Sequence, residues 1–106
     1  MLTPIKENHW NDANGNPAGG CTQGTGFTIS WQNGPLGRGA DRKEPNGAFV
    51  ESVIAAAAGR LEFYQSSKFE CAENAAALDH LKAALKILND RTADRERRAV
   101  EGTHKA

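Results

Sequence analysis

Four arginines occur within ten residues near the end of the chain, in the stretch NDRTADRERR from Asn89 to Arg98. Arg91 and Arg95 are four residues apart, so on a helix they are neighbours on one face. Two guanidinium groups side by side suit the oxygens of a phosphate group. The alternative is an ordinary helix terminus, where arginine is favoured and nearby acidic residues neutralise it through weak exposed pairs. The spacing alone leaves both interpretations open.

The arginines are not accompanied by residues typical of catalysis or metal binding. The sequence offers no activated nucleophile, no acid and base pair and no metal cluster. Cys21 and Cys71 lie fifty residues apart without a CxxC motif, so we expect free thiols rather than a zinc site or a disulfide framework. We therefore predict no catalytic residues, no metal and no cofactor, which favours a binding protein over an enzyme.

The length and net charge of the chain indicate which kinds of molecule it is expected to bind. A chain of 106 residues makes a single small domain that leaves much of its surface exposed, so oligomerisation is a reasonable expectation. Thirteen basic residues balance thirteen acidic ones, which argues against a nucleic-acid polymer or an acidic membrane as the partner. Because no apolar run has the length of a signal peptide or a membrane span, we predict a cytoplasmic protein.

The first part of the chain, residues 1–44, has the composition of a small β-rich region. Phe27, Ile29 and Trp31 alternate with polar residues, the period of a half-buried strand, and Asn33-Gly34-Pro35 then turns the chain. The preceding stretch GGCTQGTG resembles a phosphate-binding loop, but no Lys-Ser/Thr follows it. A flexible turn is the favoured interpretation of that stretch.

Residues 45–100 instead show the period of amphipathic helices. The first helix is predicted from an N-cap at Asn46 to about Gln65, and Ser67 with Glu70 has the spacing of a capping box for a second helix. So short a link predicts an antiparallel hairpin. The fold class is therefore α+β, with residues 101–106 as a C-terminal tail. The two apolar faces comprise Val50, Val53, Ile54, Ala57, Leu61 and Tyr64 on the first helix and Leu78, Leu81, Leu85 and Leu88 on the second.

Two residues on these faces have both a structural and a functional interpretation. Asn74, on the leucine side of the second helix, suits a cap or an interhelical hydrogen bond as well as a ligand contact. Tyr64, at the end of the first helix, suits the rim of the core as well as a stacking surface.

Three blocks of the sequence resemble a known family. They are GFTISWQNGPLGRG, NGAFVESVIAAAAGRLEFYQSSKFECAENAAAL and NDRTADRERRAVEGTH. Their order and spacing are similar to those of the first Thoeris anti-defence family, phage-encoded sponge proteins that share a helical-hairpin domain with the anti-CBASS sponges. The resemblance runs from about Gly26 to His104, which is most of the chain.

The resemblance implies a non-catalytic protein of the infected bacterial cytoplasm. Such a protein sequesters the cyclic ADP-ribose isomer (gcADPR) that Thoeris TIR enzymes make from NAD, and so blocks activation of the effector. Some members similarly bind cyclic di- or trinucleotides of CBASS. The family's ligand residues are an aromatic, an asparagine and two arginines, and the matching positions here hold Tyr64, Asn74, Arg91 and Arg95.

The spacing of these four residues constrains the assembly. Asn74 and Arg91 are separated by roughly 26 Å along one helix, too far for a nucleotide to bridge within one chain. Two hairpins packed antiparallel would bring one chain's turn beside the other's arginines and create two equivalent sites. We therefore predict a homodimer with ligand sites between its subunits, with a hexamer built from three such dimers as a further level. The alternative function is a helical-hairpin module that docks a phage or host protein.

Overall fold

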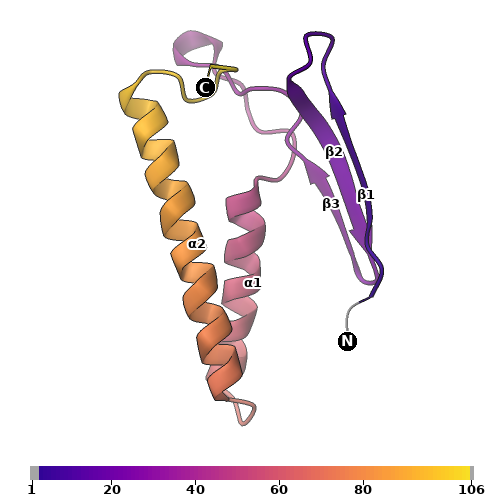
Figure 1. Cartoon of the computed structure of the whole chain (residues 1–106), viewed down its shortest axis with the longest axis vertical. Coiled ribbons are helices and arrows are strands. Elements are labelled where there is room, and N and C mark those ends of the chain that lie inside the picture. Colours follow the sequence, from indigo (N-terminus) through magenta and orange to yellow (C-terminus); the bar gives the residue numbers. More distant parts are fainter. Residues whose placement is uncertain (1–2, 106) are drawn as a thin grey trace. The chain divides into compact units, whose positions relative to one another are not determined.

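The computed structural model describes residues 3–105 and contains a three-stranded antiparallel sheet followed by two helices (Figure 1). This architecture confirms the α+β class predicted from the sequence. Contacts divide the chain into two compact units. The hairpin unit is Val50–Arg97, and the sheet unit comprises the residues before Val50 together with those after Arg97.

The sheet is a simple meander of neighbouring strands. Its strands are β1 (Lys6–Asn11), β2 (Pro17–Gly24) and β3 (Phe27–Trp31), in the spatial order β1-β2-β3. Trp31 donates its indole N–H to the hydroxyl of Thr22 at 2.8 Å, which satisfies the buried Thr22 side chain. The strand predicted from the alternation of Phe27, Ile29 and Trp31 is therefore confirmed as β3.

The stretch GGCTQGTG is not the flexible turn that the sequence predicted. All but its last two residues belong to β2, which pairs with β1 on one side and β3 on the other. Backbone hydrogen bonds to two neighbours hold this strand, so it needs few large side chains of its own. Glycine is even required within it, because a Cβ on Gly20 would lie 2.7 Å from the carbonyl oxygen of Asn8.

The C-terminal segment packs within the sheet unit. The N–H of Gly37 donates to the carbonyl oxygen of Gly102 at 2.8 Å. The Glu101 carboxylate lies 2.6 Å from Nη1 of Arg42, and Nη1 of Arg38 donates to the Glu101 carbonyl oxygen at 3.0 Å. Bonds between positions about sixty residues apart in the sequence thus fix this segment on the loop after β3.

Gly102→Ala is expected to detach this segment. Gly102 has a φ of +77°, and a Cβ there would overlap the Gly37 carbonyl oxygen, so the substitution adds a clash to roughly 1–2 kcal/mol of left-handed strain. Faster amide hydrogen exchange at Gly37 and a lower Tm are the expected results. Gly15→Ala is the matched control, because Gly15 also has a positive φ but open space around its Cβ position. Equal effects of the two substitutions would contradict the role of the close approach.

The two helices form the predicted hairpin, but both begin later than expected. α1 spans Val50–Gln65 and α2 spans Ala72–Arg97. Asn46 is not the N-cap of α1, because its side-chain amide is bonded to the backbone of Asn33 at 2.8 and 3.1 Å.

The predicted capping box at Ser67 is also wrong. The Ser67 hydroxyl donates to the Tyr64 carbonyl oxygen at 2.6 Å and accepts the N–H of Phe69 at 3.1 Å. Ser67 therefore closes the end of α1 instead of opening α2. Cys71 takes the capping position, since its sulfur accepts the N–H of Asn74 at 3.4 Å.

The hairpin buries little apolar surface by itself. Only Ala58 on α1 and Leu78 on α2 are buried among its described residues, and the other leucines of the stripe are half-buried. Val50, expected on the apolar face, is 51% exposed. Among residues 3–105 no helix combines the length and the apolar character needed to cross a membrane.

Candidate ligand-binding site

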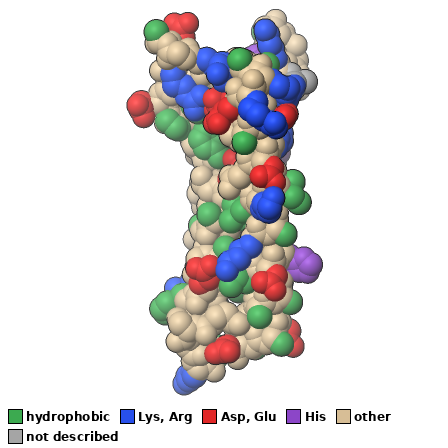
Figure 2. Space-filling view, turned by 90° about the vertical axis from the view of Figure 1, so that its left-hand side faces the viewer, with side chains coloured by type: hydrophobic (Ala, Val, Ile, Leu, Met, Phe, Trp, Pro, Cys, Tyr) green, Lys and Arg blue, Asp and Glu red, His purple; other side chains and the backbone are tan. Residues whose placement is uncertain are grey.

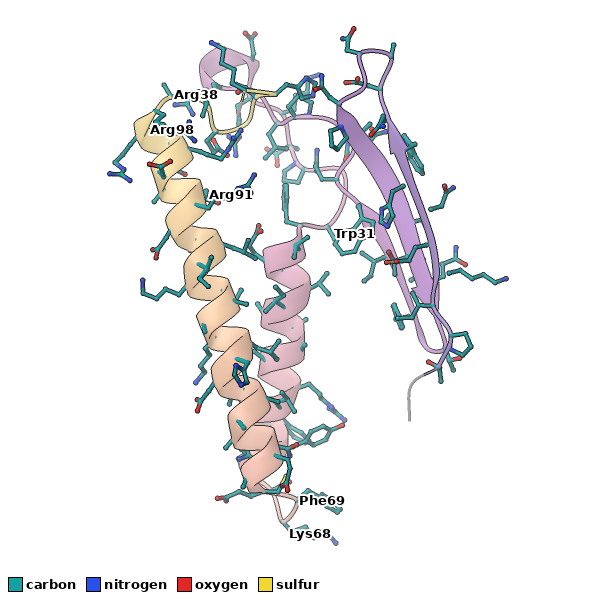
Figure 3. The ribbon with its side chains drawn as sticks, in the orientation of Figure 1. Trp31, Arg38, Lys68, Phe69, Arg91 and Arg98 are labelled. Carbon is teal, nitrogen blue, oxygen red and sulfur yellow. The ribbon has the colours of Figure 1, made fainter. Side chains whose placement is uncertain are left out.

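The four candidate residues lie at opposite ends of the hairpin unit. Tyr64 is in the last turn of α1 and Asn74 in the first turn of α2, whereas Arg91 and Arg95 are near the end of α2. Figure 3 shows Arg91 near one end of α2 and the tip of the hairpin, marked by Phe69, at the other. Because α2 is continuous from Ala72 to Arg97, Asn74 and Arg91 are roughly 26 Å apart along it. One chain therefore does not bring the four residues together.

The turn end of the hairpin, residues 60–74, has a firmly held backbone. Besides the bond from Ser67, the Gln65 side chain forms two hydrogen bonds with Cys71, donating to its carbonyl oxygen and accepting its N–H, each at 3.1 Å. These bonds tie the end of α1 to the start of α2. The position of Tyr64 and Asn74 relative to each other is consequently fixed by local contacts.

Tyr64 presents a half-buried ring flanked by two other side chains. The Nε–H of Arg60 donates to the Tyr64 hydroxyl oxygen at 3.1 Å, and the guanidinium carbon lies 4.9 Å from the ring centroid. The ring of Phe63 lies 6.0 Å from that of Tyr64, tilted by 59°. Arg60 was not among the residues singled out in the sequence, although its spacing of four from Tyr64 on a helix is a signal that could have identified it.

The Asn74 side chain is hydrogen-bonded locally and, within residues 3–105, forms no hydrogen bond to α1. Its side-chain nitrogen lies 3.5 Å from the carbonyl oxygen of Phe69, at the limit of a hydrogen bond. The side-chain oxygen accepts no hydrogen bond within residues 3–105. An amide with one weak internal bond has both donor and acceptor capacity for a ligand.

At the other end of the hairpin, Arg91 and Arg95 lie on the part of α2 that extends beyond α1. α2 has 26 residues and α1 has 16, so the last turns of α2 extend beyond the start of α1. Arg91 is exposed and Arg95 is half-buried. We call Arg91 and Arg95 the arginine end of the hairpin.

Two acidic residues near the arginine end, Asp90 and Asp94, are paired with cations other than Arg91. Asp90 accepts from Lys86 at 2.7 Å, a hydrogen bond that raises the pKa of Lys86 above its ordinary value. Asp94 pairs with Arg97 at 3.0 Å. The side chain of Arg91 has no hydrogen bond or ion pair with any residue from 3 to 105. Neutralisation of Arg91 by a neighbouring carboxylate is therefore not seen among residues 3–105. The extension of α2 beyond α1 agrees with the alternative interpretation of the sequence, an ordinary helix terminus.

The described residues contain no group of three or more His, Cys, Asp or Glu side chains placed to hold a metal ion. Cys21 and Cys71 are free and half-buried. The chemistry available at the two ends of the hairpin is stacking, amide hydrogen bonding and cationic hydrogen bonding. These are interactions by which proteins bind nucleotides.

Comparisons with known proteins relate the hairpin to a described family. A family model described as "Acb2/Tad1, hairpin domain" matches residues 25–93, a range that includes three of the four candidate residues. A relative from Bacillus phage SBSphiJ7 named "Thoeris anti-defense 1" is 47% identical over 77 residues. The match covers 73% of this chain and 51% of the relative, so the chain spans about half the relative's length.

Proposed function

The chain belongs to the Acb2/Tad1 hairpin-domain family, and on that basis we propose that it is a phage anti-defence protein that captures a nucleotide signal. The signal is the cyclic ADP-ribose isomer gcADPR made from NAD by Thoeris TIR enzymes. The protein binds this molecule without cleaving it in the cytoplasm of the infected bacterium. Sequestration keeps the signal from the effector, so the defence system is not activated.

The observation that carries the proposal is that the two ends of one hairpin carry complementary kinds of side chain. The turn end offers an aromatic ring and an amide, and the arginine end offers the exposed guanidinium of Arg91, which has no hydrogen bond or ion pair among residues 3–105. A cyclic ADP-ribose isomer combines a purine with a pyrophosphate and therefore needs both kinds of group. In the proposed site Tyr64 stacks on the purine, Asn74 reads a base edge or ribose hydroxyl, and Arg91 and Arg95 bind the pyrophosphate.

Two half-sites roughly 26 Å apart require a second copy of the chain. An antiparallel pair of hairpins sets the turn end of one subunit beside the arginine end of the other and forms two equivalent sites. The exposed apolar side chains of the hairpin support such pairing, because Phe63, Phe69 and Ile87 are 59%, 65% and 66% exposed. Figure 2 shows hydrophobic side chains on the visible surface of the hairpin among the charged ones. Dimers of this kind are the proposed unit, and a hexamer would consist of three.

Mass spectrometry of captured ligand tests this function. Purified protein is incubated with the product of an active TIR enzyme, separated from free small molecules and denatured. Release of an intact cyclic ADP-ribose isomer is the expected result, and it would also exclude hydrolysis by the protein. Recovery of a linear product would indicate an enzyme instead.

Failure to deplete the nucleotide would favour the alternative function, a hairpin that docks a phage or host protein. The same incubation with cyclic di- and trinucleotides tests whether CBASS signals are also captured. Strongly salt-dependent binding to DNA or RNA would instead indicate a nucleic-acid binder, which the balanced charge of the chain disfavours.

A further inference from the structure

Arg60 occupies an unusual position beside the candidate stacking residue. Its guanidinium carbon lies 4.9 Å from the ring centroids of both Phe63 and Tyr64, within the range of a cation–π interaction. Its Nε–H also donates to the Tyr64 hydroxyl at 3.1 Å. The guanidinium is thereby held by three contacts from one turn of α1.

The charge of Arg60 is not neutralised by the described residues. No carboxylate from residues 3–105 lies within ion-pair distance of it, and Glu62, the acidic residue closest in sequence, pairs with Lys82 of α2 at 3.5 Å. Arg60 is exposed, and its terminal nitrogens form no hydrogen bond to residues 3–105. The Nε–H of Arg60 donates to Tyr64, while its terminal N–H groups remain available as charge-assisted donors.

A tyrosine at the end of a helix would otherwise have a mobile ring. The backbone of Tyr64 is fixed by Ser67, but that bond does not restrict rotation about the side-chain bonds. The hydrogen bond from Arg60 to the hydroxyl and the contact with the ring do restrict it. Holding a stacking ring in its bound orientation before the ligand arrives lowers the entropic cost of binding.

We infer that Arg60 is a fifth residue of the ligand site, which holds the Tyr64 ring as a preformed stacking surface and donates to an anionic group of the nucleotide stacked there. This inference rests on the proposed function, since it assumes that Tyr64 stacks on the ligand. It adds a third cation to the site, from the subunit opposite the one that provides Arg91 and Arg95. The site then selects purine ligands that carry phosphate close to the stacked base.

The orientation of the ring can be measured without any ligand. Tyr64 is the one tyrosine of the chain, so replacing tyrosine by 3-fluorotyrosine gives a protein with a single 19F NMR signal. Arg60→Gln is expected to shift and narrow that signal, because the ring gains motion when the guanidinium is removed. Lys68→Gln is the matched control: Lys68 is a cation of the same turn end that contacts Phe69 at 5.3 Å instead of Tyr64, and its removal should leave the signal unchanged.

Binding is then measured with the cyclic ADP-ribose isomer prepared by a TIR enzyme, for the wild type and the variants. Arg60→Gln should weaken binding about three- to tenfold and reduce its dependence on salt concentration, because one ionic contact is lost. Arg60→Lys keeps the charge but not the planar donor, so it should recover the salt dependence and only part of the affinity. Lys68→Gln should stay within about twofold of the wild type, since an exposed charge that does not touch the ligand is largely screened.

The possible outcomes separate the two proposals. Absence of binding by the wild-type protein would overturn the proposed function, and with it the role of Arg60. Wild-type binding together with an Arg60→Gln variant of unchanged affinity would overturn the role of Arg60 alone, whatever its 19F signal. If Arg60→Gln weakened binding but left the 19F signal unchanged, Arg60 would not hold the Tyr64 ring, and that part of the inference would be overturned. Circular dichroism of each variant verifies that its helix content is intact.

Discussion

Arg91→Ala is expected to weaken capture of the cyclic ADP-ribose isomer severely while the fold stays intact. Arg91 is exposed and has no ion pair or hydrogen bond from its side chain within residues 3–105, so its removal breaks no polar contact of the side chain among those residues. A hydrogen bond to a charged group contributes about 1.5–3 kcal/mol, which corresponds to roughly 10- to 150-fold in affinity. Isothermal titration calorimetry measures the change, and circular dichroism measures the fold.

Two further substitutions make this prediction specific. Arg97→Ala removes another exposed arginine two turns later on α2, but one that is paired with Asp94 at 3.0 Å, and it should bind normally. Arg91→Lys keeps the charge and loses the planar pair of donors, so it should restore binding only in part. Full affinity in Arg91→Ala would remove the arginine end from the site.

The second large effect is expected from a heterodimer of two inactive chains. Tyr64→Ala removes the stacking ring from the turn end, and Arg91→Ala removes the guanidinium from the arginine end. Each variant alone should fail to capture the ligand. If the chains are produced together with different affinity tags and purified through both, each heterodimer should regain one intact site, about half the number in the wild-type dimer.

The heterodimer experiment distinguishes a shared site from a site within one chain. In the heterodimer the Arg91→Ala subunit supplies an intact turn end and the Tyr64→Ala subunit an intact arginine end. Were both ends used within a single chain, every chain in the mixture would be defective and no site would be regained. The restored site should also have the wild-type affinity, because both of its halves are unaltered.

Local features of the sequence predicted both helices correctly. They did not predict the residues at which the helices begin. The periodic apolar residues identified both helices, and Gln65 is the end of α1 as predicted. Asn46 and Ser67 are good capping residues by type, yet the first is bonded to Asn33 and the second closes α1. A polar side chain near a helix start has several backbone groups within reach, and the sequence alone does not decide among them.

The sheet was only partly predictable for a different reason. β3 has alternating large side chains, whereas β2 is rich in glycine and small residues and looks like a turn. A strand held by hydrogen bonds to two neighbours acquires its conformation from residues distant in the sequence. The position of the C-terminal segment also depends on residues distant in the sequence, because Arg38 and Arg42 hold Glu101.

For the candidate site, the sequence by itself determined the residue types, their spacing on two helices and hence the family. These features depend on the helical repeat, which is fixed by local backbone geometry. The tertiary structure alone decided how the charges pair: Asp90 with Lys86, Asp94 with Arg97, and Arg91 with no described residue. It also placed Arg60 against Tyr64. Several partners lie within reach of each long charged side chain on a helix, so the choice among them requires the three-dimensional positions of all of them.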